Sequence, residues 1–176
     1  MEVWSWHGLV THYVLFVIEL ATRKVAICGI TTNPDERWML QIARGAFDSE
    51  SGLLYGKKYL IVDRDTKYTA AFRAFPAREK VEVIRLPPRS PTLNAYAERF
   101  VRSIKSECVS KLIPIGAPML RRALRDYMQH YHTERNHQGL DNNLITSTPV
   151  QGSKTGPIAC RSRLGGVLRF YERAAA

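Results

Sequence analysis

The sequence has little cysteine and no long apolar run. Its three cysteines, Cys28, Cys108 and Cys160, are odd in number and far apart, and none belongs to a Cys-x-x-Cys pair. This spacing argues against a disulfide framework and a zinc site, and it predicts free thiols in a reducing compartment. The longest apolar stretch, residues 13–18, is stopped by Glu19 and falls short of the roughly 20 residues of a membrane-spanning helix. We therefore expect a cytoplasmic protein with no membrane partner.

Acidic residues are scarce as well. Lys and Arg number 26 against 16 Asp and Glu, so the 176-residue chain carries a formal charge of +10, with a pI near 9.8. This balance favours a polyanionic partner such as nucleic acid, although many basic proteins bind nothing in particular. With 45% hydrophobic residues, the chain is long enough for one globular unit with its own core and too short for two substantial domains.

The first thirty residues have the composition of a β-sheet. Segments 3–6, 11–20 and 24–31 are rich in Val, Ile, Tyr, Phe and Thr, and residues 7–8 read as a turn between the first two. These segments predict three strands in an antiparallel meander. The continuous apolar run within 11–20 is typical of a central strand that is covered on both faces.

Helices and strands are predicted to alternate from residue 33 onwards. Asn33 is expected to cap a helix that runs to about Phe47. A strand at 58–62, a short helix ending near Phe75 and a strand at 81–86 follow. This alternation predicts a parallel α/β arrangement in the second half of the sheet.

Two amphipathic helices and a basic tail complete the predicted organisation. Apolar residues recur at helical spacing from Leu93 to about Leu112 and again over residues 118–133. We expect residues 1–145 to form the core domain and residues 146–176 a basic, loosely packed extension that ends in a short apolar piece at 167–171.

Two carboxylates stand where metal chemistry could occur. Asp63 follows the predicted strand 58–62, at the edge where ligands bind α/β sheets, and Glu98 lies early in the helix that follows. Carboxylates from different elements can share Mg²⁺ ions about 4 Å apart, which is the arrangement used in phosphodiester chemistry. Simpler roles remain open. The run 63–66 could be a turn that caps the next helix, with Arg64 solvated, and Glu98 could pair with Arg102 on an exposed helix face.

Three segments occur together in one order. They are Tyr-Leu-Ile-Val-Asp-Arg-Asp-Thr-Lys-Tyr-Thr at 59–69, Pro-Arg-Ser-Pro-Thr-Leu-Asn-Ala-Tyr-Ala-Glu-Arg-Phe-Val-Arg-Ser-Ile-Lys-Ser-Glu at 88–107 and Tyr-His-Thr-Glu-Arg-Asn-His-Gln-Gly-Leu at 131–140. In this order they resemble the catalytic core of insertion-sequence transposases related to retroviral integrases. The resemblance implies an α/β, ribonuclease H-like fold with a five-stranded mixed sheet, whose first three strands are antiparallel, flanked by helices. It also implies that Asp63 and Glu98 are catalytic, bind Mg²⁺ or Mn²⁺, and act in metal-dependent phosphodiester hydrolysis and strand transfer.

The resemblance also implies a first catalytic Asp that these residues do not supply. Aligned on Glu2 and on residues 13–23, that Asp would fall a few positions before Met1. Glu2 lies on the first strand, but five positions along a strand face the opposite side of the sheet. We therefore expect impaired catalysis. The alternative is a non-catalytic remnant that binds DNA or joins a transposase as a subunit, and an unrelated ribonuclease H-like nuclease is a third reading.

The resemblance further implies DNA as the partner, with the chain working as a homo-oligomer on element ends and target DNA. The expected phosphate contacts come from cations around the predicted site, and their affinity should fall with salt. These cations are Arg89, Arg102, Lys105, Arg121, Arg122, Arg125 and Arg135. Asn94, Tyr131 and His137 belong to the family motifs, and a structural role is expected for the last of these segments, with Arg135 or His137 bonding the end of the last helix.

Overall fold

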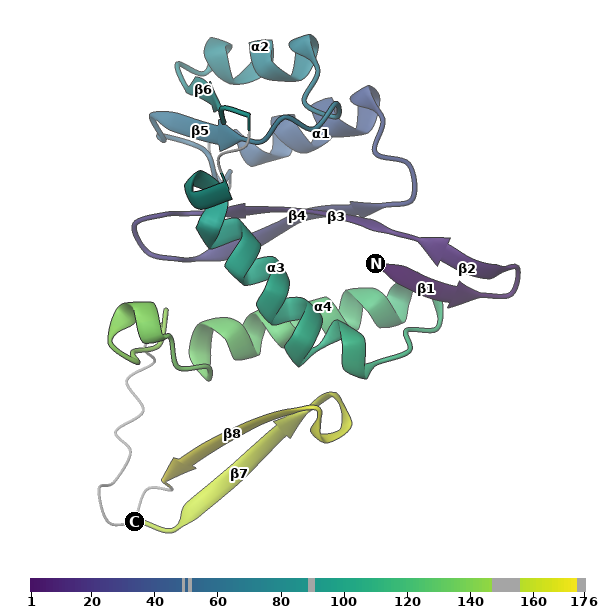
Figure 1. Cartoon of the computed structure of the whole chain (residues 1–176), viewed down its shortest axis with the longest axis vertical. Helices are drawn as coiled ribbons and strands as arrows, with labels where there is room; N and C mark the ends of the chain where they lie inside the picture. The colour runs from purple at the N-terminus through teal and green to yellow at the C-terminus, as the bar shows by residue number, and fades with distance from the viewer. Residues whose placement is uncertain (49, 51, 89–90, 147–155, 174–176) are drawn as a thin grey trace. The chain divides into compact units, whose positions relative to one another are not determined.

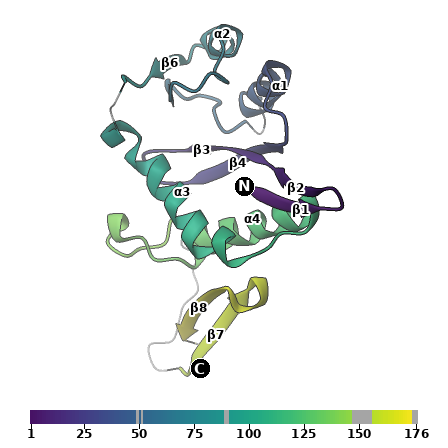
Figure 2. The same ribbon diagram turned by 45° about the vertical axis from the view of Figure 1, so that its right-hand side comes forward.

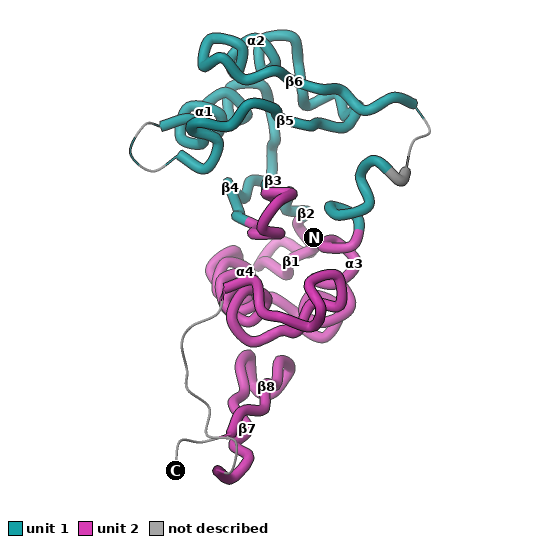
Figure 3. Tube along the Cα trace, turned by 90° about the vertical axis from the view of Figure 1, so that its left-hand side faces the viewer, with its two compact units in different colours: residues 1, 11–17, 26–98 teal, residues 2–10, 18–25, 99–176 magenta. Residues whose placement is uncertain are grey.

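A computed structural model describes residues 1–48, 50, 52–88, 91–146 and 156–173. Its elements are shown in Figure 1 and, in a second view, in Figure 2. The chain divides into two compact units, coloured separately in Figure 3. The first comprises residues 1, 11–17 and 26–98, and the second comprises residues 2–10, 18–25 and 99–176. The second unit contains both residues 99–145 and the tail, and the expected boundary near residue 145 stays a prediction.

The first unit holds most of the alternating α/β part of the chain. Its helix α1 begins after Asp35, whose side chain accepts a hydrogen bond from the Trp38 backbone N–H, so Asp35 is the cap in place of the predicted Asn33. Thr69 caps α2 in the same way through the Phe72 N–H. The elements are β3 (Tyr13–Ile18), β4 (Val25–Thr31), α1 (Glu36–Ala46), β5 (Tyr59–Val62), α2 (Ala70–Arg78) and β6 (Glu82–Arg85).

Strands β5 and β6 pair in parallel, with Tyr59 opposite Glu82 and Val62 opposite Arg85. A parallel pair needs a crossover, and α2 supplies it, which confirms the parallel arrangement predicted from the alternating pattern. The core beneath this pair contains Met39 and Ala43 of α1, Val62 of β5 and Phe72 of α2. Both helices therefore bury one face against the strands, and the carboxyl end of β5 rests on this core.

The amino-terminal strands differ from the predicted meander. The first predicted segment ends at Ser5 in β1 (Glu2–Ser5), and a further strand, β2 (Gly8–Thr11), pairs with it after the turn. Gly8 has a φ of +105°, a conformation that suits glycine, and this allows the chain to reverse so early. Strands β3 and β4 form their own pair. The described strands therefore pair two by two, and they do not form the five-stranded sheet that we expected.

The second unit is built on two helices, α4 (Gly116–Thr133) and the part of α3 (Ala95–Glu107) from Arg99 onwards. The short helix η1 (Pro91–Asn94) and residues 95–98 belong to the first unit, and η2 (Val109–Lys111) lies between α3 and α4 in the sequence. The predicted helix to Leu112 ends early, because Cys108 leaves helical geometry. Much of the predicted apolar stripes is nevertheless buried: Phe100 and Ile104 on α3, Cys108 directly after it, and Leu120, Leu124, Tyr127 and Tyr131 on α4. None of the helices in the described ranges has the length and apolarity needed to cross a bilayer.

The carboxyl-terminal tail contains structure that the sequence analysis did not predict. After η3 (Gln138–Leu140), strands β7 (Ile158–Arg163) and β8 (Leu168–Arg173) form an antiparallel hairpin around η4 (Leu164–Gly166). Part of the expected loose extension, 147–155 and 174–176, lies outside the described residues. The apolar piece predicted at 167–171 contributes Leu168, which is only 3% exposed. Most other hairpin side chains are exposed, so apolar periodicity gave no signal for these strands.

Candidate active site

Asp63 follows β5 directly, at the carboxyl end of the parallel pair, and it is exposed. Its Oδ1 accepts a hydrogen bond from the Asp65 backbone N–H at 2.9 Å. Both carboxylate oxygens of Asp65 accept hydrogen bonds from Lys67, one from the ammonium group at 2.6 Å and one from the backbone N–H at 3.0 Å. These bonds hold the pKa of the Asp65 carboxyl below its usual value. Of these two acids, Asp63 is therefore the one with a carboxylate oxygen, Oδ2, that no described group contacts.

The chain around Asp63 is fixed by packing and by hydrogen bonds. Val62 is 5% exposed, and Tyr68 packs on the same core. Burial, together with the charges of Asp63 and Asp65, raises the pKa of Tyr68 to about 12. Arg64 is exposed, as expected, and its Nε also donates to the Leu86 carbonyl at 3.0 Å, just beyond β6. Asp63 therefore stands on a rigid strand end rather than on a loose loop.

Glu98 lies in the first turn of α3 and is exposed. A carboxylate there interacts favourably with the positive end of the helix dipole. Asp63 and Glu98 both belong to the first compact unit. Within the described ranges, no three His, Cys, Asp or Glu side chains gather as a potential metal site. Carboxylate oxygens such as those of Asp63 and Glu98 are ligands of the kind that Mg²⁺ accepts, because this ion keeps several waters and commonly binds protein through one or two carboxylates with substrate phosphate.

Most of the predicted phosphate-binding cations are exposed. Arg102 and Lys105 are exposed on α3, and α4 exposes Arg121, Arg122 and Arg125. Arg122 is 3.8 Å from Asp126 one turn later, in an exposed pair that contributes little to stability. Arg89 lies outside the described residues.

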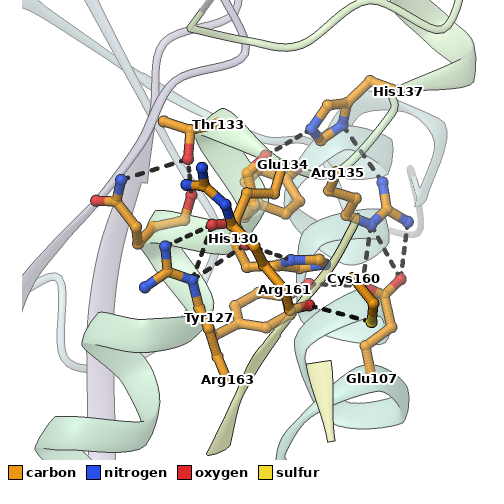
Figure 4. Close-up of polar contacts among 12 residues, drawn as sticks. Glu107, Tyr127, His130, Thr133, Glu134, Arg135, His137, Cys160, Arg161 and Arg163 are labelled. Atoms are coloured by element: carbon orange, nitrogen blue, oxygen red, sulfur yellow. Dashed lines mark hydrogen bonds and ion pairs between the residues drawn. The ribbon is translucent and has the colours of Figure 1, made fainter. Parts of the chain in front are cut away.

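Arg135 differs from these cations because its guanidinium is held by an acid. Its Nε and Nη2 donate to the carboxylate of Glu107 at 2.8 to 3.1 Å, in a bidentate arrangement drawn in Figure 4. The guanidinium also lies 5.7 Å from the centre of the Tyr131 ring. This pair links the residues after α4 to the end of α3. Glu107 is the last residue of the second motif, but the sequence analysis did not single it out, because no pattern there points to Arg135.

Tyr131 and His137 meet in the same cluster. Their ring centres are 4.7 Å apart in an edge-on arrangement, and Phe100 packs on Tyr131 in a similar way. The Nε2 of His137 donates to the Tyr131 carbonyl at 2.7 Å, in the last turn of α4. Burial lowers the pKa of His137, so the ring is neutral near pH 7. These contacts favour a structural role for His137. Asn94 ends η1 and is half-buried.

A second cluster, which the sequence analysis missed, joins α4 to the hairpin. The Nδ1 of His130 donates to Glu134 at 3.0 Å, and the guanidinium of Arg163 donates to the same carboxylate, with its Nε 3.0 Å from both oxygens. Figure 4 shows the three side chains converging. Hydrogen bonds from Arg163, and then from His130, lower the pKa of Glu134. The i,i+4 spacing of His130 and Glu134 is visible in the sequence, but their pairing with Arg163 is not.

Residues 79–144 match the family model of the integrase core domain. This match includes Glu98 and the segment around Tyr131, and over these residues it supports the resemblance to an integrase or transposase core. The fold is similar to that of a chain from the simian T-cell lymphotropic virus intasome, solved by cryo-EM in complex with the PP2A regulatory subunit B56 gamma. The identity is 13%, the TM-score is 0.57, and the match covers 99% of this chain and 64% of the other. No curated protein matches the sequence.

Proposed function

We propose that this chain is the core of a DNA transposase or integrase, in which Asp63 and Glu98 bind a divalent metal ion. The observation that carries the proposal is the placement of Asp63. It is an exposed acid on a fixed strand end, at the carboxyl edge of a parallel pair where α/β sheets bind ligands. Glu98 is the second proposed ligand, and it lies in the first turn of α3, inside the segment that matches an integrase core domain.

The donor set suits Mg²⁺ or Mn²⁺, because both ions prefer oxygen ligands. Bound metal supplies a lowered pKa for an attacking water or 3′ hydroxyl and charge neutralisation at the phosphate. The chain's own contribution is to hold the two carboxylates in place. The turn from Asp63 to Asp65 keeps one oxygen of Asp63 engaged, while Lys67 neutralises Asp65 beside it.

DNA is the proposed substrate, and the exposed cations of α3 and α4 are its proposed phosphate contacts. Arg135 is the exception, because its bidentate bonds to Glu107 favour a structural role. We also propose assembly on DNA as a homo-oligomer, in keeping with the intasome to which the fold is similar.

A second function is favoured by one sequence observation. The 176 residues contain two of the three acids that the resemblance implies. Loss of a ligand at a site of this kind removes much of the activity, so cleavage by these 176 residues should be weak. The alternative is therefore a chain that binds DNA or a transposase partner without catalysing strand transfer.

Metal binding and cleavage are measured separately on the same protein. Titration with Mn²⁺, followed by electron paramagnetic resonance, reports occupancy, and nicking of supercoiled plasmid reports phosphodiester hydrolysis. Asp63→Asn and Glu98→Gln should each weaken Mn²⁺ binding by about tenfold or more, as expected for loss of a ligand. Glu36→Gln is the matched control, since Glu36 is also an exposed acid in the first turn of a helix.

The outcomes separate the two functions. Nicking that requires Mg²⁺ or Mn²⁺ and is lost in Glu98→Gln supports the transposase or integrase core. Salt-dependent DNA binding with no Mn²⁺ binding at Asp63 and Glu98 supports the non-catalytic alternative. A chain that binds neither Mn²⁺ nor DNA contradicts both.

A further inference from the structure

The β7–β8 hairpin has two faces of different character. Strand geometry places alternate residues on opposite faces, and the register puts Ser162 opposite Arg169 and Cys160 opposite Tyr171. The exposed positions of β8 are Arg169, Tyr171 and Arg173, at every second residue. All three therefore share one face, here called the outer face, with Cys160 and Ser162 as exposed neighbours on β7.

The opposite face anchors the hairpin to the end of α4. Leu168 is 3% exposed, and Arg163 opposite it is bonded to Glu134 at the end of α4. Arg161 and Glu172 lie on the same inner face and form an ion pair at 2.5 Å. The acid of the hairpin is therefore neutralised on the inner face, and the outer face has only positive charge.

The outer-face arginines are oriented but not neutralised. Arg169 donates from Nε to the Gly166 carbonyl at 3.3 Å, and Arg173 donates from Nη1 to the Gly156 carbonyl at 3.1 Å. Neither guanidinium pairs with a carboxylate in the part of the chain that the structure describes. Each bond uses one nitrogen of its guanidinium and leaves other N–H donors for a ligand.

We propose that the outer face of the β7–β8 hairpin binds the phosphate backbone of DNA through Arg169, Tyr171 and Arg173. The inference rests on the proposed function, for which it adds a DNA contact outside the integrase core match at 79–144. Charge complementarity favours the negatively charged DNA backbone as the partner, because two guanidinium groups that pair with no acid among the described residues flank Tyr171, which is 59% exposed. Arginine and tyrosine side chains are both common donors to phosphate oxygens.

The geometry suits an extended polyanion. Residues four apart on a strand are separated by roughly 13 Å, which is close to the rise of about four nucleotides along one strand of duplex DNA. Arg169 and Arg173 can thus contact different phosphates of one strand, with the Tyr171 hydroxyl between them. Contacts of this kind carry no base information, so the face should bind DNA irrespective of sequence.

The test is fluorescence anisotropy of a labelled duplex of mixed sequence, titrated with the full chain at several salt concentrations between about 50 and 200 mM. Arg169→Gln combined with Arg173→Gln should raise Kd and make the slope of log K against log salt shallower by about 2, since each phosphate contact contributes about 0.9. Tyr171→Phe should weaken binding by a smaller factor with an unchanged slope, because it removes a hydroxyl and no charge.

The control is Arg37→Gln combined with Arg78→Gln, two exposed helical arginines whose loss changes the net charge equally. If the hairpin double variant binds with the same Kd and slope as this control, the proposed contact is wrong and the face serves another partner. If the unmodified chain itself fails to bind DNA, the proposed function fails instead. Circular dichroism of each variant confirms that the comparison is between folded proteins.

Discussion

Arg135 donates hydrogen bonds from two guanidinium nitrogens, Nε and Nη2, to the carboxylate of Glu107 at 2.8 to 3.1 Å. This ion pair links the chain beyond α4 to the last residue of α3. The two residues are 28 positions apart. The pair also places the guanidinium against the Tyr131 ring and beside His137. A segment that resembles a transposase motif therefore acts as a brace between two helices of the second unit.

Arg135→Lys should destabilise the fold, because a lysine ammonium cannot reproduce the bidentate bonds to Glu107. Loss of a charge-assisted hydrogen bond costs about 1–3 kcal/mol, and each kcal/mol lowers the melting temperature of a chain of this size by about 2–4 °C. Differential scanning fluorimetry gives the comparison. Arg122→Lys is the control, since the side chain of Arg122 is 76% exposed and its partner is 3.8 Å away. Equal melting temperatures for the two variants would contradict the bracing role.

Gly29→Ala should destabilise the first unit. A Cβ at this position would lie 2.7 Å from both Ile42 Cδ1 and Trp38 Cζ2, so α1 could no longer approach β4 so closely. Overpacking of this kind costs about 1–3 kcal/mol, measurable by urea denaturation. Gly45→Ala is the matched control: a Cβ there meets nothing within 4 Å, and the exchange in a helix should stabilise by about 0.5–1 kcal/mol. A neutral Gly29→Ala would mean that α1 can shift to accommodate the methyl group.

Stability should fall as the pH drops below about 6.5. The Nε2 of His132 accepts a hydrogen bond from the Val25 backbone N–H at 3.1 Å, which requires a neutral ring. Burial, followed by the nearby charges of His137 and Lys24, lowers the pKa of His132 below its ordinary value of 6.5. The unfolded chain therefore binds the proton first as the pH falls, and stability is lost between 6.5 and the lower folded pKa.

Urea unfolding at pH values from 7.5 to 5.5 measures this loss, and His132→Gln should make the pH dependence weaker. His7→Gln is the control, because His7 is exposed in the turn after β1. Histidine NMR signals provide an independent check. If the His132 ring titrates at or above 6.5 in the folded protein, the sign of the predicted dependence is wrong.

Arg163→Gln should loosen the attachment of the hairpin to α4. The change removes the charge-assisted bonds from the guanidinium to Glu134 and leaves a largely buried carboxylate with His130 as its remaining partner. Amide hydrogen exchange should then become faster in β7 and β8, while β5 and β6 keep their protection. Arg161→Gln is the control, because Arg161 pairs with Glu172 inside the hairpin itself. Faster exchange in both variants would show that Glu134 is not the anchor.

Local pattern was sufficient for much of the fold. The strand at 58–62 and the strand at 81–86 appear within one or two residues of their predicted bounds, as β5 and β6. The apolar stripes of α3 and α4 were also read correctly, because burial follows the 3.6-residue period of a helix. The amino-terminal strands were predicted less accurately. The turn at Gly8 produces the pair β1–β2 beside the pair β3–β4, in place of the predicted three-stranded meander.

The sequence by itself determined the alternation of helices and strands from α1 to β6, the positive charge, and the three motifs that resemble an integrase core. These depend on composition and short-range spacing, which a linear chain displays directly. Only the tertiary structure decided that Arg135 pairs with Glu107 and that Arg163 pairs with Glu134. It also decided that residues 158–173 of the basic tail form a hairpin with a charged outer face. Such partners are nearly thirty residues apart, and no periodicity specifies which distant acid an arginine will meet once the chain has folded.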